Sequence, residues 1–437
     1  MTILFVFLSI ALFVLLIVWA KLNPFLSFLI SAIAAGFLLG LPADQVASSI
    51  QKGMGALLGD LVIVIVTGAM LGKLVAESGA AQRIAGFLMG IFGEKHITWA
   101  MALTGLVVGV PLFYNVGFVL LVPLAFTLSH QYKLPSVYVG MPLLAALSVT
   151  HGFLPPHPSP AALVGQFGAN MGLTLLYGGI VAIPTIILAG PLLAPFLRNI
   201  SSQPLKTFQA DPKPEAELPG IGTSVLTALL PVVLLVVTTL LSLSVATEDP
   251  LRPLLNFIAN PSVVMLVSIA FATYSLGLRR KQSMTQLMDI YTVATKDISM
   301  ILLIVAGAGA LKQVFTDSGV SLALAEGIQS WEMHPLILAW LITAVIRVAV
   351  GSATVAGLTT AGIIAPLVPT LNVDPNLLVL SIGAGSLVFS HFNDGGFWMF
   401  KEYFNLSIKD TLRSWTLMET IVAVAGLGWV LLLDLIL

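Results

Sequence analysis

Long apolar runs are the feature that most restricts what this chain can fold into. About 20 consecutive apolar residues are enough for a helix to cross the hydrocarbon core of a bilayer. Only 9% of the 437 residues are charged, against about 25% in a soluble domain. We therefore predict an all-α polytopic membrane protein with about ten transmembrane helices. The apolar runs lie at residues 3–20, 24–41, 57–76, 136–170, 172–197, 222–244, 260–279, 296–315, 376–400 and 415–436.

Two other apolar segments, 97–130 and 335–371, are each too short for two full spans and a loop. Small and polar residues stand in the middle of each, at 114–117 and at 351–354. Irregular backbone at membrane depth is tolerated only where protein or a water-filled cavity satisfies its polar groups. We predict that both segments are re-entrant helical hairpins.

One pattern occurs twice, about 240 positions apart, and divides the chain into halves 1–200 and 222–437 around a polar linker, 201–221. Breaks at corresponding places in two halves of a membrane chain are typical of a transporter's binding site. The matching positions are Asn23-Pro24 and Asn260-Pro261, Ser78-Gly79 and Ser318-Gly319, Gly117 and Gly357, Pro135 and Pro375, and His151 and His391.

Charge placement predicts the orientation of the halves. With the N-terminus outside, most basic residues fall in inner loops, as the positive-inside rule requires, and both termini lie outside. The first half then crosses the membrane an odd number of times, so the second is an inverted repeat. A net charge of −1 argues against a nucleic-acid partner, and the absence of cysteine excludes disulfides and thiolate metal sites. No cofactor is expected.

The first half breaks within the predicted helix 136–170. Four prolines in six positions, 155–160, cannot sustain a helix, because each removes a backbone donor. The freed backbone groups and nearby side chains predict a polar binding pocket, and the alternative is an ordinary outer loop. The candidate binding residues are Thr150, His151, Pro156 and His157.

The second half breaks within the predicted helix 376–400, where the candidate residues are Ser390, His391, Asn393 and Asp394. Asp394 is the only carboxylate that this interpretation places near the membrane centre in this half. Because a buried charge is costly, Asp394 is a candidate proton carrier or an acceptor for substrate hydroxyls. The alternative is a cap on the helix that begins near Phe397, where aspartate is common. His151 and His391 are the other proton-carrier candidates.

The hairpin tips complete the predicted site with Asn115 in the first hairpin and Ser352 and Thr354 in the second. Helix N-termini at such tips carry partial positive charge and suit an anionic group. Arg347 lies one turn before the second tip and can hold a carboxylate through two nitrogens. Two other roles are open for the Arg347 side chain: it can extend toward the membrane–water interface, or it can pair with an acidic side chain.

Six stretches resemble the gluconate:proton symporter (gluconate permease) family, within the ion transporter superfamily. The resemblance implies a bacterial inner-membrane carrier that imports gluconate or a related sugar acid with protons. It also implies a homodimer in which an elevator-like domain carries both hairpins. The matching stretches are residues 68–73, 111–113 with 116–121, 147–158, 312–314 with 317–320, 351–356, and 390–391 with 393–394 and 396–398.

The chain departs from the family at Asn115, where the family has glutamate. Asn cannot titrate, so if that glutamate carries the proton in the family, proton coupling is either absent here or rests on Asp394 or a histidine. Two rival functions stay open: a sodium- or proton-coupled carrier of another hydroxy acid, a dicarboxylate or D-serine, and an intramembrane metalloenzyme. The enzyme would use His151, His157, His391 and Asp394, but these residues lack the helical spacing of metal ligands.

Overall fold

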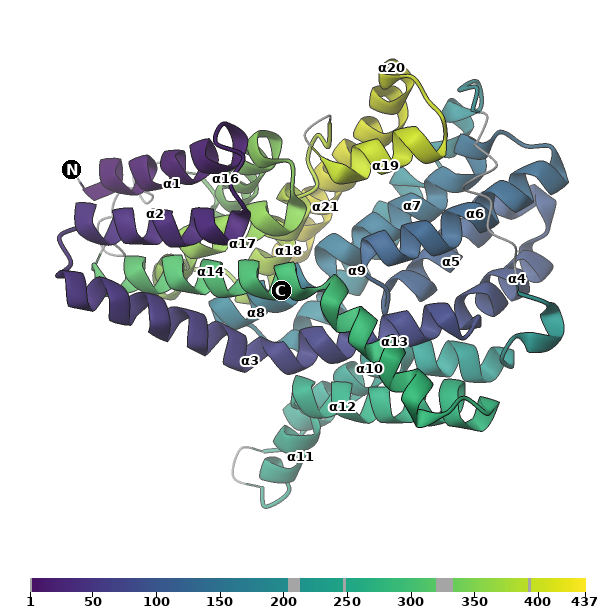
Figure 1. Cartoon of the computed structure of the whole chain (residues 1–437), viewed down its shortest axis with the longest axis horizontal. Helices are drawn as coiled ribbons and strands as arrows, with labels where there is room; N and C mark the ends of the chain where they lie inside the picture. The colour runs from purple at the N-terminus through teal and green to yellow at the C-terminus, as the bar shows by residue number, and fades with distance from the viewer. Residues whose placement is uncertain (1, 203–212, 247–248, 320–332, 392–393) are drawn as a thin grey trace.

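The computed structural model describes residues 2–202, 213–246, 249–319, 333–391 and 394–437. Within these ranges every regular element is helical, as predicted (Figure 1). Apolar side chains also cover much of the outer surface, including Phe7, Ile183 and Val345. Such a surface suits contact with lipid rather than water.

The described residues of the first half form nine α-helices. They are α1 (Thr2–Val18), α2 (Pro24–Leu38), α3 (Ala43–Glu77), α4 (Ala80–Phe92), α5 (Ile97–Gly109), α6 (Tyr114–Tyr132), α7 (Ser136–Phe153), α8 (Pro158–Phe167) and α9 (Met171–Ala189).

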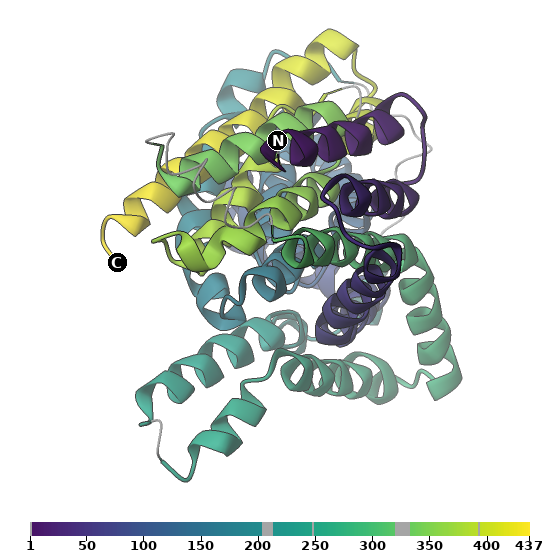
Figure 2. The ribbon, with the colours of Figure 1, turned by 90° about the vertical axis from the view of Figure 1, so that its left-hand side faces the viewer.

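The described part of the second half is also helical. Its elements are α10 (Ile221–Ser244), α11 (Arg252–Ile258), α12 (Pro261–Ala272), η5 (Thr273–Gly277), η6 (Leu278–Arg280), α13 (Met284–Asp297), α14 (Ser299–Asp317), α16 (Pro335–Val350), α17 (Ala353–Ile364), η7 (Ala365–Thr370), α18 (Pro375–Gly385), α19 (Gly395–Tyr403), α20 (Ile408–Thr411), η8 (Leu412–Thr416) and α21 (Leu417–Asp434). Figures 1 and 2 agree that α10, α11 and α12 lie along one edge of the molecule.

Equivalent helix ends in the two halves have the same local chemistry. The Asn23 side chain accepts a hydrogen bond from the Phe25 amide at 2.8 Å and caps α2. Asn260 caps α12 in the same way, accepting from the Ser262 amide at 2.9 Å. In each pair a proline begins the helix, where its missing N–H costs nothing.

Among the described residues, five helices are long and apolar enough to span a membrane, or up to seven if two bent pairs each count as one span. Several of the other predicted spans correspond to shorter apolar helices, among them α2 and α18. The exact number of spans therefore stays a prediction. What the fold establishes is a multi-pass, all-helical membrane protein.

Helix α3 is much longer than the predicted span 57–76, because it begins at Ala43. The angle between its two parts, Ala43–Gly59 and Val62–Glu77, is 45°. The angle between α13 and α14 is 43°. The added parts are amphipathic, so a search for uniformly apolar runs misses them. In α13, for example, Leu287 and Tyr291 are buried although the helix is polar on its other side.

Helices α3 and α14 cross at a point where two glycines meet. A Cβ atom on Gly53 would lie 2.2 Å from the carbonyl oxygen of Gly309, and one on Gly309 would lie 2.4 Å from that of Gly53. A similar contact joins the two interrupted helices, because a Cβ on Gly383 would lie 2.4 Å from the Gly152 oxygen. Small residues at such crossings let membrane helices approach closely.

The described end of the linker lies against the corner between α3 and α4. Lys213 Nζ donates to the Glu77 carbonyl at 2.5 Å, and Arg83 Nε donates to the Pro219 carbonyl at 2.9 Å. Arg83 also forms an ion pair with Glu215 at 3.2 Å. This segment thus fastens the start of the second half to the first half.

Candidate functional site

Two helix–turn–helix tips face one cavity. Residues 110–113 separate α5 from α6, and Gly351 and Ser352 separate α16 from α17. Gly351 has a φ of 77°, in the left-handed region that favours glycine. Ser352 then caps α17 by accepting a hydrogen bond from the Val355 amide at 3.4 Å. Both tips therefore present a helix N-terminus toward the cavity.

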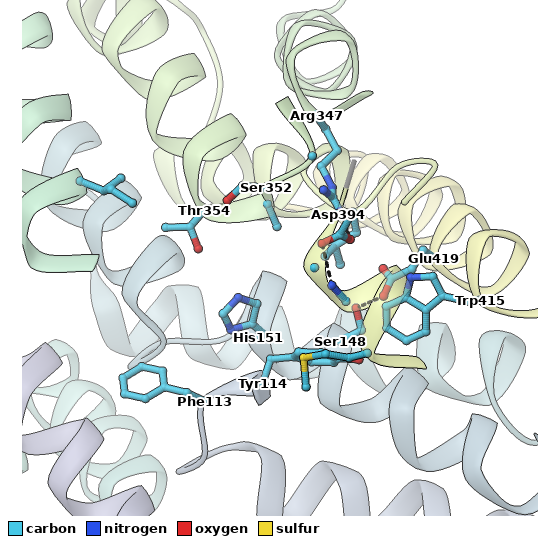
Figure 3. A pocket seen from close by; sticks show the side chains of 17 residues that line it. Phe113, Tyr114, Ser148, His151, Arg347, Ser352, Thr354, Asp394, Trp415 and Glu419 are labelled. Carbon is cyan, nitrogen blue, oxygen red and sulfur yellow. Dashed lines mark hydrogen bonds and ion pairs between the residues drawn. The ribbon is translucent and has the colours of Figure 1, made fainter. Parts of the chain in front are cut away.

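The cavity has a volume of about 350 Å³. Figure 3 shows Ser352 and Thr354 on one side, Phe113 and Tyr114 on the opposite side, and His151 between them. The lining residues are Phe113, Tyr114, Ser148, His151, Ile304, Arg347, Gly351, Ser352, Ala353, Thr354, Leu387, Asp394, Gly395, Gly396, Met399, Trp415 and Glu419. The cavity is large enough for a small polar molecule and draws on both halves of the chain.

Arg347 and Asp394 form an ion pair at the edge of this cavity, with 2.5 Å between Nη2 and Oδ2. The Arg347 side chain is only 3% exposed. Its Nε and Nη1 atoms are buried and have no hydrogen-bond partner in the described part of the chain. A buried guanidinium with unused donors is suited to an anion, because an unpaired buried donor is costly.

Asp394 has two structural roles at once. Besides pairing with Arg347, it accepts a hydrogen bond from the Gly396 amide at 2.9 Å and so caps α19. The Ser390 hydroxyl also donates to Asp394. The helix cap and the position in the site, which the sequence presented as alternatives, therefore occur together.

Glu419 corrects the expectation that Asp394 is the only central carboxylate of the second half. Glu419 is 2% exposed, lines the cavity from α21, and accepts a hydrogen bond from the Ser148 hydroxyl at 2.6 Å. Its other carboxylate oxygen, Oε2, is buried and has no hydrogen-bond partner among the described residues. The signal that sequence reasoning overlooked is an acid within the apolar run 415–436.

The three candidate histidines occupy different environments. His151 lines the cavity, and its Nδ1 has no described partner. His157 lies behind it, with ring centres 5.3 Å apart, and its Nε2 donates to the Gly109 carbonyl at 2.9 Å. His391 is buried outside the lining, where its Nε2 donates to the Val348 carbonyl at 3.2 Å. Of the two histidines at matching positions, His151 thus lines the cavity and His391 does not.

Three other predicted residues, Thr150, Pro156 and Ser390, are not part of the cavity lining. The Thr150 hydroxyl donates to the Leu147 carbonyl of its own helix at 3.0 Å, and Pro156 is buried. Ser390 is also buried. Its hydroxyl accepts a hydrogen bond from Trp415 Nε1 at 2.8 Å and donates one to Asp394, so it helps to hold Asp394 in place. Asn393 and the side chain of Asn115 lie outside the described residues.

The arrangement resembles those of two solved membrane transporters. One is the Alcanivorax borkumensis YdaH transporter, with a TM-score of 0.66, 18% identity, and coverage of 94% of this chain and 97% of that one. The other is Neisseria gonorrhoeae MtrF, described as illuminating a class of antimetabolite efflux pumps, with a TM-score of 0.66, 13% identity and 97% coverage of both chains. These similarities show a shared helical fold. The family model and the relatives described next make the chain a membrane transporter rather than an enzyme.

The family follows from sequence similarity, since residues 1–436 match the family model of the GntP family permeases. The high-affinity gluconate transporter of Escherichia coli K12 is 46% identical over the full length of both chains. The gluconate permease of Bacillus subtilis 168 is 45% identical, covering 96% of each chain. The Gnt-II system L-idonate transporter of Escherichia coli K12 is 44% identical, covering 98% of each. The chain belongs to the GntP permease family, which confirms the predicted resemblance.

Proposed function

We propose that this protein imports gluconate or a related sugar acid together with protons across a bacterial inner membrane. The observation that carries the proposal is the buried Arg347, which gives one nitrogen to Asp394 and keeps Nε and Nη1 unpartnered beside the cavity. Relatives at 44–46% identity over nearly the whole chain are named as gluconate and L-idonate transporters.

The substrate carboxylate would bind Arg347 and the N-terminus of α17. Ser352 and Thr354 line the cavity at that tip and can donate to a carboxylate oxygen. The sugar-acid hydroxyls would face His151 and the carboxylate of Asp394, which line the same cavity. A polyol carboxylate matches this combination of one cation and several hydrogen-bonding groups.

Transport would proceed by elevator-like alternating access in a homodimer. The sequence pattern that occurs twice and the two tips at one cavity favour two inverted repeats, whose hairpins move together with the bound substrate. The distribution of basic residues favours an outside location for both termini. The proton carriers predicted from the sequence are Asp394, His151 and His391.

The main alternative is a carrier for another hydroxy acid, a dicarboxylate or D-serine, coupled to sodium or protons. Titration of the purified protein with each compound, with and without sodium, distinguishes these substrates. Gluconate and idonate should bind without sodium, and Arg347→Gln should abolish binding. Tight binding of D-serine or a dicarboxylate but not of gluconate would overturn the proposed substrate, and a sodium requirement would overturn proton coupling.

A further inference from the structure

We propose that Glu419 is the side chain that takes up the co-transported proton when the sugar-acid anion binds. This inference rests on the function proposed above and names the group that couples the two events. Glu419 is buried in the cavity wall, and its Oε2 has no hydrogen-bond partner in the described part of the chain. An unpartnered, buried carboxylate oxygen is where a proton binds at least cost.

Asp394 is poorly suited to the same task, because its surroundings stabilise its charged form. It receives a hydrogen bond from Arg347, one from the Ser390 hydroxyl and one from the Gly396 amide. Protonating Asp394 would leave the Arg347 charge uncompensated in a buried site. Asp394 therefore serves as the counter-charge of Arg347.

A negative charge on Glu419 is stabilised by fewer hydrogen bonds than a negative charge on Asp394. Among the described residues its single hydrogen bond comes from Ser148, at 2.6 Å. The charged or titratable groups that share the cavity with it are Arg347, Asp394, Tyr114 and His151. Arg347 is the one guanidinium of the described lining; it pairs with Asp394 and, among the described residues, donates no hydrogen bond to Glu419.

The charges in the cavity then link proton binding to anion binding. With Glu419 ionised and His151 neutral, two carboxylates face one guanidinium, and the lining has a net negative charge that repels a sugar acid. With Glu419 protonated, Arg347 and Asp394 balance, and the anion meets Arg347 without that repulsion. Each ligand thus favours binding of the other, as thermodynamic linkage requires.

The proton step is balanced at a single oxygen. An O–H bond forms at Glu419 Oε2 with a proton from outside water before or as the anion binds. After the cavity opens inward, the anion leaves and the same O–H bond breaks, releasing the proton to inside water. One proton and one negative charge cross together, so the cycle moves no net charge for a monovalent sugar acid.

The test is the pH dependence of gluconate binding to the purified protein. The Kd of the unmodified protein should rise about tenfold per pH unit once Glu419 ionises in the free protein. Glu419→Gln cannot ionise, so its Kd should become independent of pH over that range, whatever its absolute affinity. Glu402→Gln, an exposed acid paired with Lys401, is the matched control and should keep the full dependence.

A second variant keeps the inference testable if Glu419→Gln does not fold. Ser148→Ala removes the described hydrogen bond to Glu419, destabilises the carboxylate, and should move the midpoint of the pH dependence about one unit higher. An unchanged pH dependence in both variants, or its loss in His151→Gln instead, would overturn the role of Glu419. Failure of the unmodified protein to bind gluconate at any pH would instead refute the proposed function.

Discussion

Arg347 and Asp394 lie 2.5 Å apart and connect the end of α16 to the N-terminus of α19. Arg347 thus lies in the last turn of α16, and Asp394 caps α19, 47 positions later. Their pairing explains how an arginine is held inside a membrane chain: one charge is balanced within the protein, and the remaining donors stay available.

Separating the two charges should destabilise the protein, because the remaining charge has no partner in a buried site. Arg347→Gln or Asp394→Asn alone should lower the free energy of unfolding by about 3–5 kcal/mol. The double variant should recover part of this loss but should not bind gluconate. Thermal unfolding in detergent and binding titration measure the two effects. Equal stability of all four proteins would show that the pair contributes nothing.

The glycine contact between α3 and α14 predicts a steep steric effect. Gly53→Ala places a Cβ 2.2 Å from the Gly309 carbonyl oxygen, a backbone atom that cannot move aside. We expect a loss of about 1–3 kcal/mol in stability. Gly55→Ala, two residues along the same helix, has no atom within 4 Å of its new Cβ and should be neutral or slightly stabilising. Similar melting temperatures for both variants would contradict the described crossing.

Ser352 should affect both the helix cap and the substrate. Ser352→Ala removes a cap worth about 1 kcal/mol and a hydroxyl in the cavity, so we expect gluconate affinity to fall about tenfold. Ser283→Ala removes the cap of α13, which does not line the cavity, and should cost similar stability with no change in Kd. Equal Kd values for the two variants would remove Ser352 from the site.

The predicted orientation can be tested with single cysteines, since the chain contains none of its own. A membrane-impermeant thiol reagent on intact cells should label Asp249→Cys but not Glu215→Cys. Glu215→Cys should react only after the membrane is opened, because α10 separates the two positions and the linker is predicted to be cytoplasmic. The reverse pattern would invert the proposed topology.

Local signals along the chain predicted much of the helix layout. Prolines 155, 156 and 158 account for the end of α7 at Phe153, because they cannot continue a helix. The amphipathic start of α3 was missed, because its apolar residues cover only one side. Contacts between distant segments could not be predicted: Ser148 and Glu419 are 271 positions apart, and neither residue type indicates the other.

Uptake of labelled gluconate into proteoliposomes tests the central claim most directly. With the outside about one pH unit more acidic than the inside, electroneutral cotransport of one proton per anion predicts about tenfold accumulation at steady state. A protonophore should abolish this accumulation, and Arg347→Gln should take up no gluconate. Gluconate that only equalises across the membrane, with or without the pH gradient, would contradict proton-coupled import.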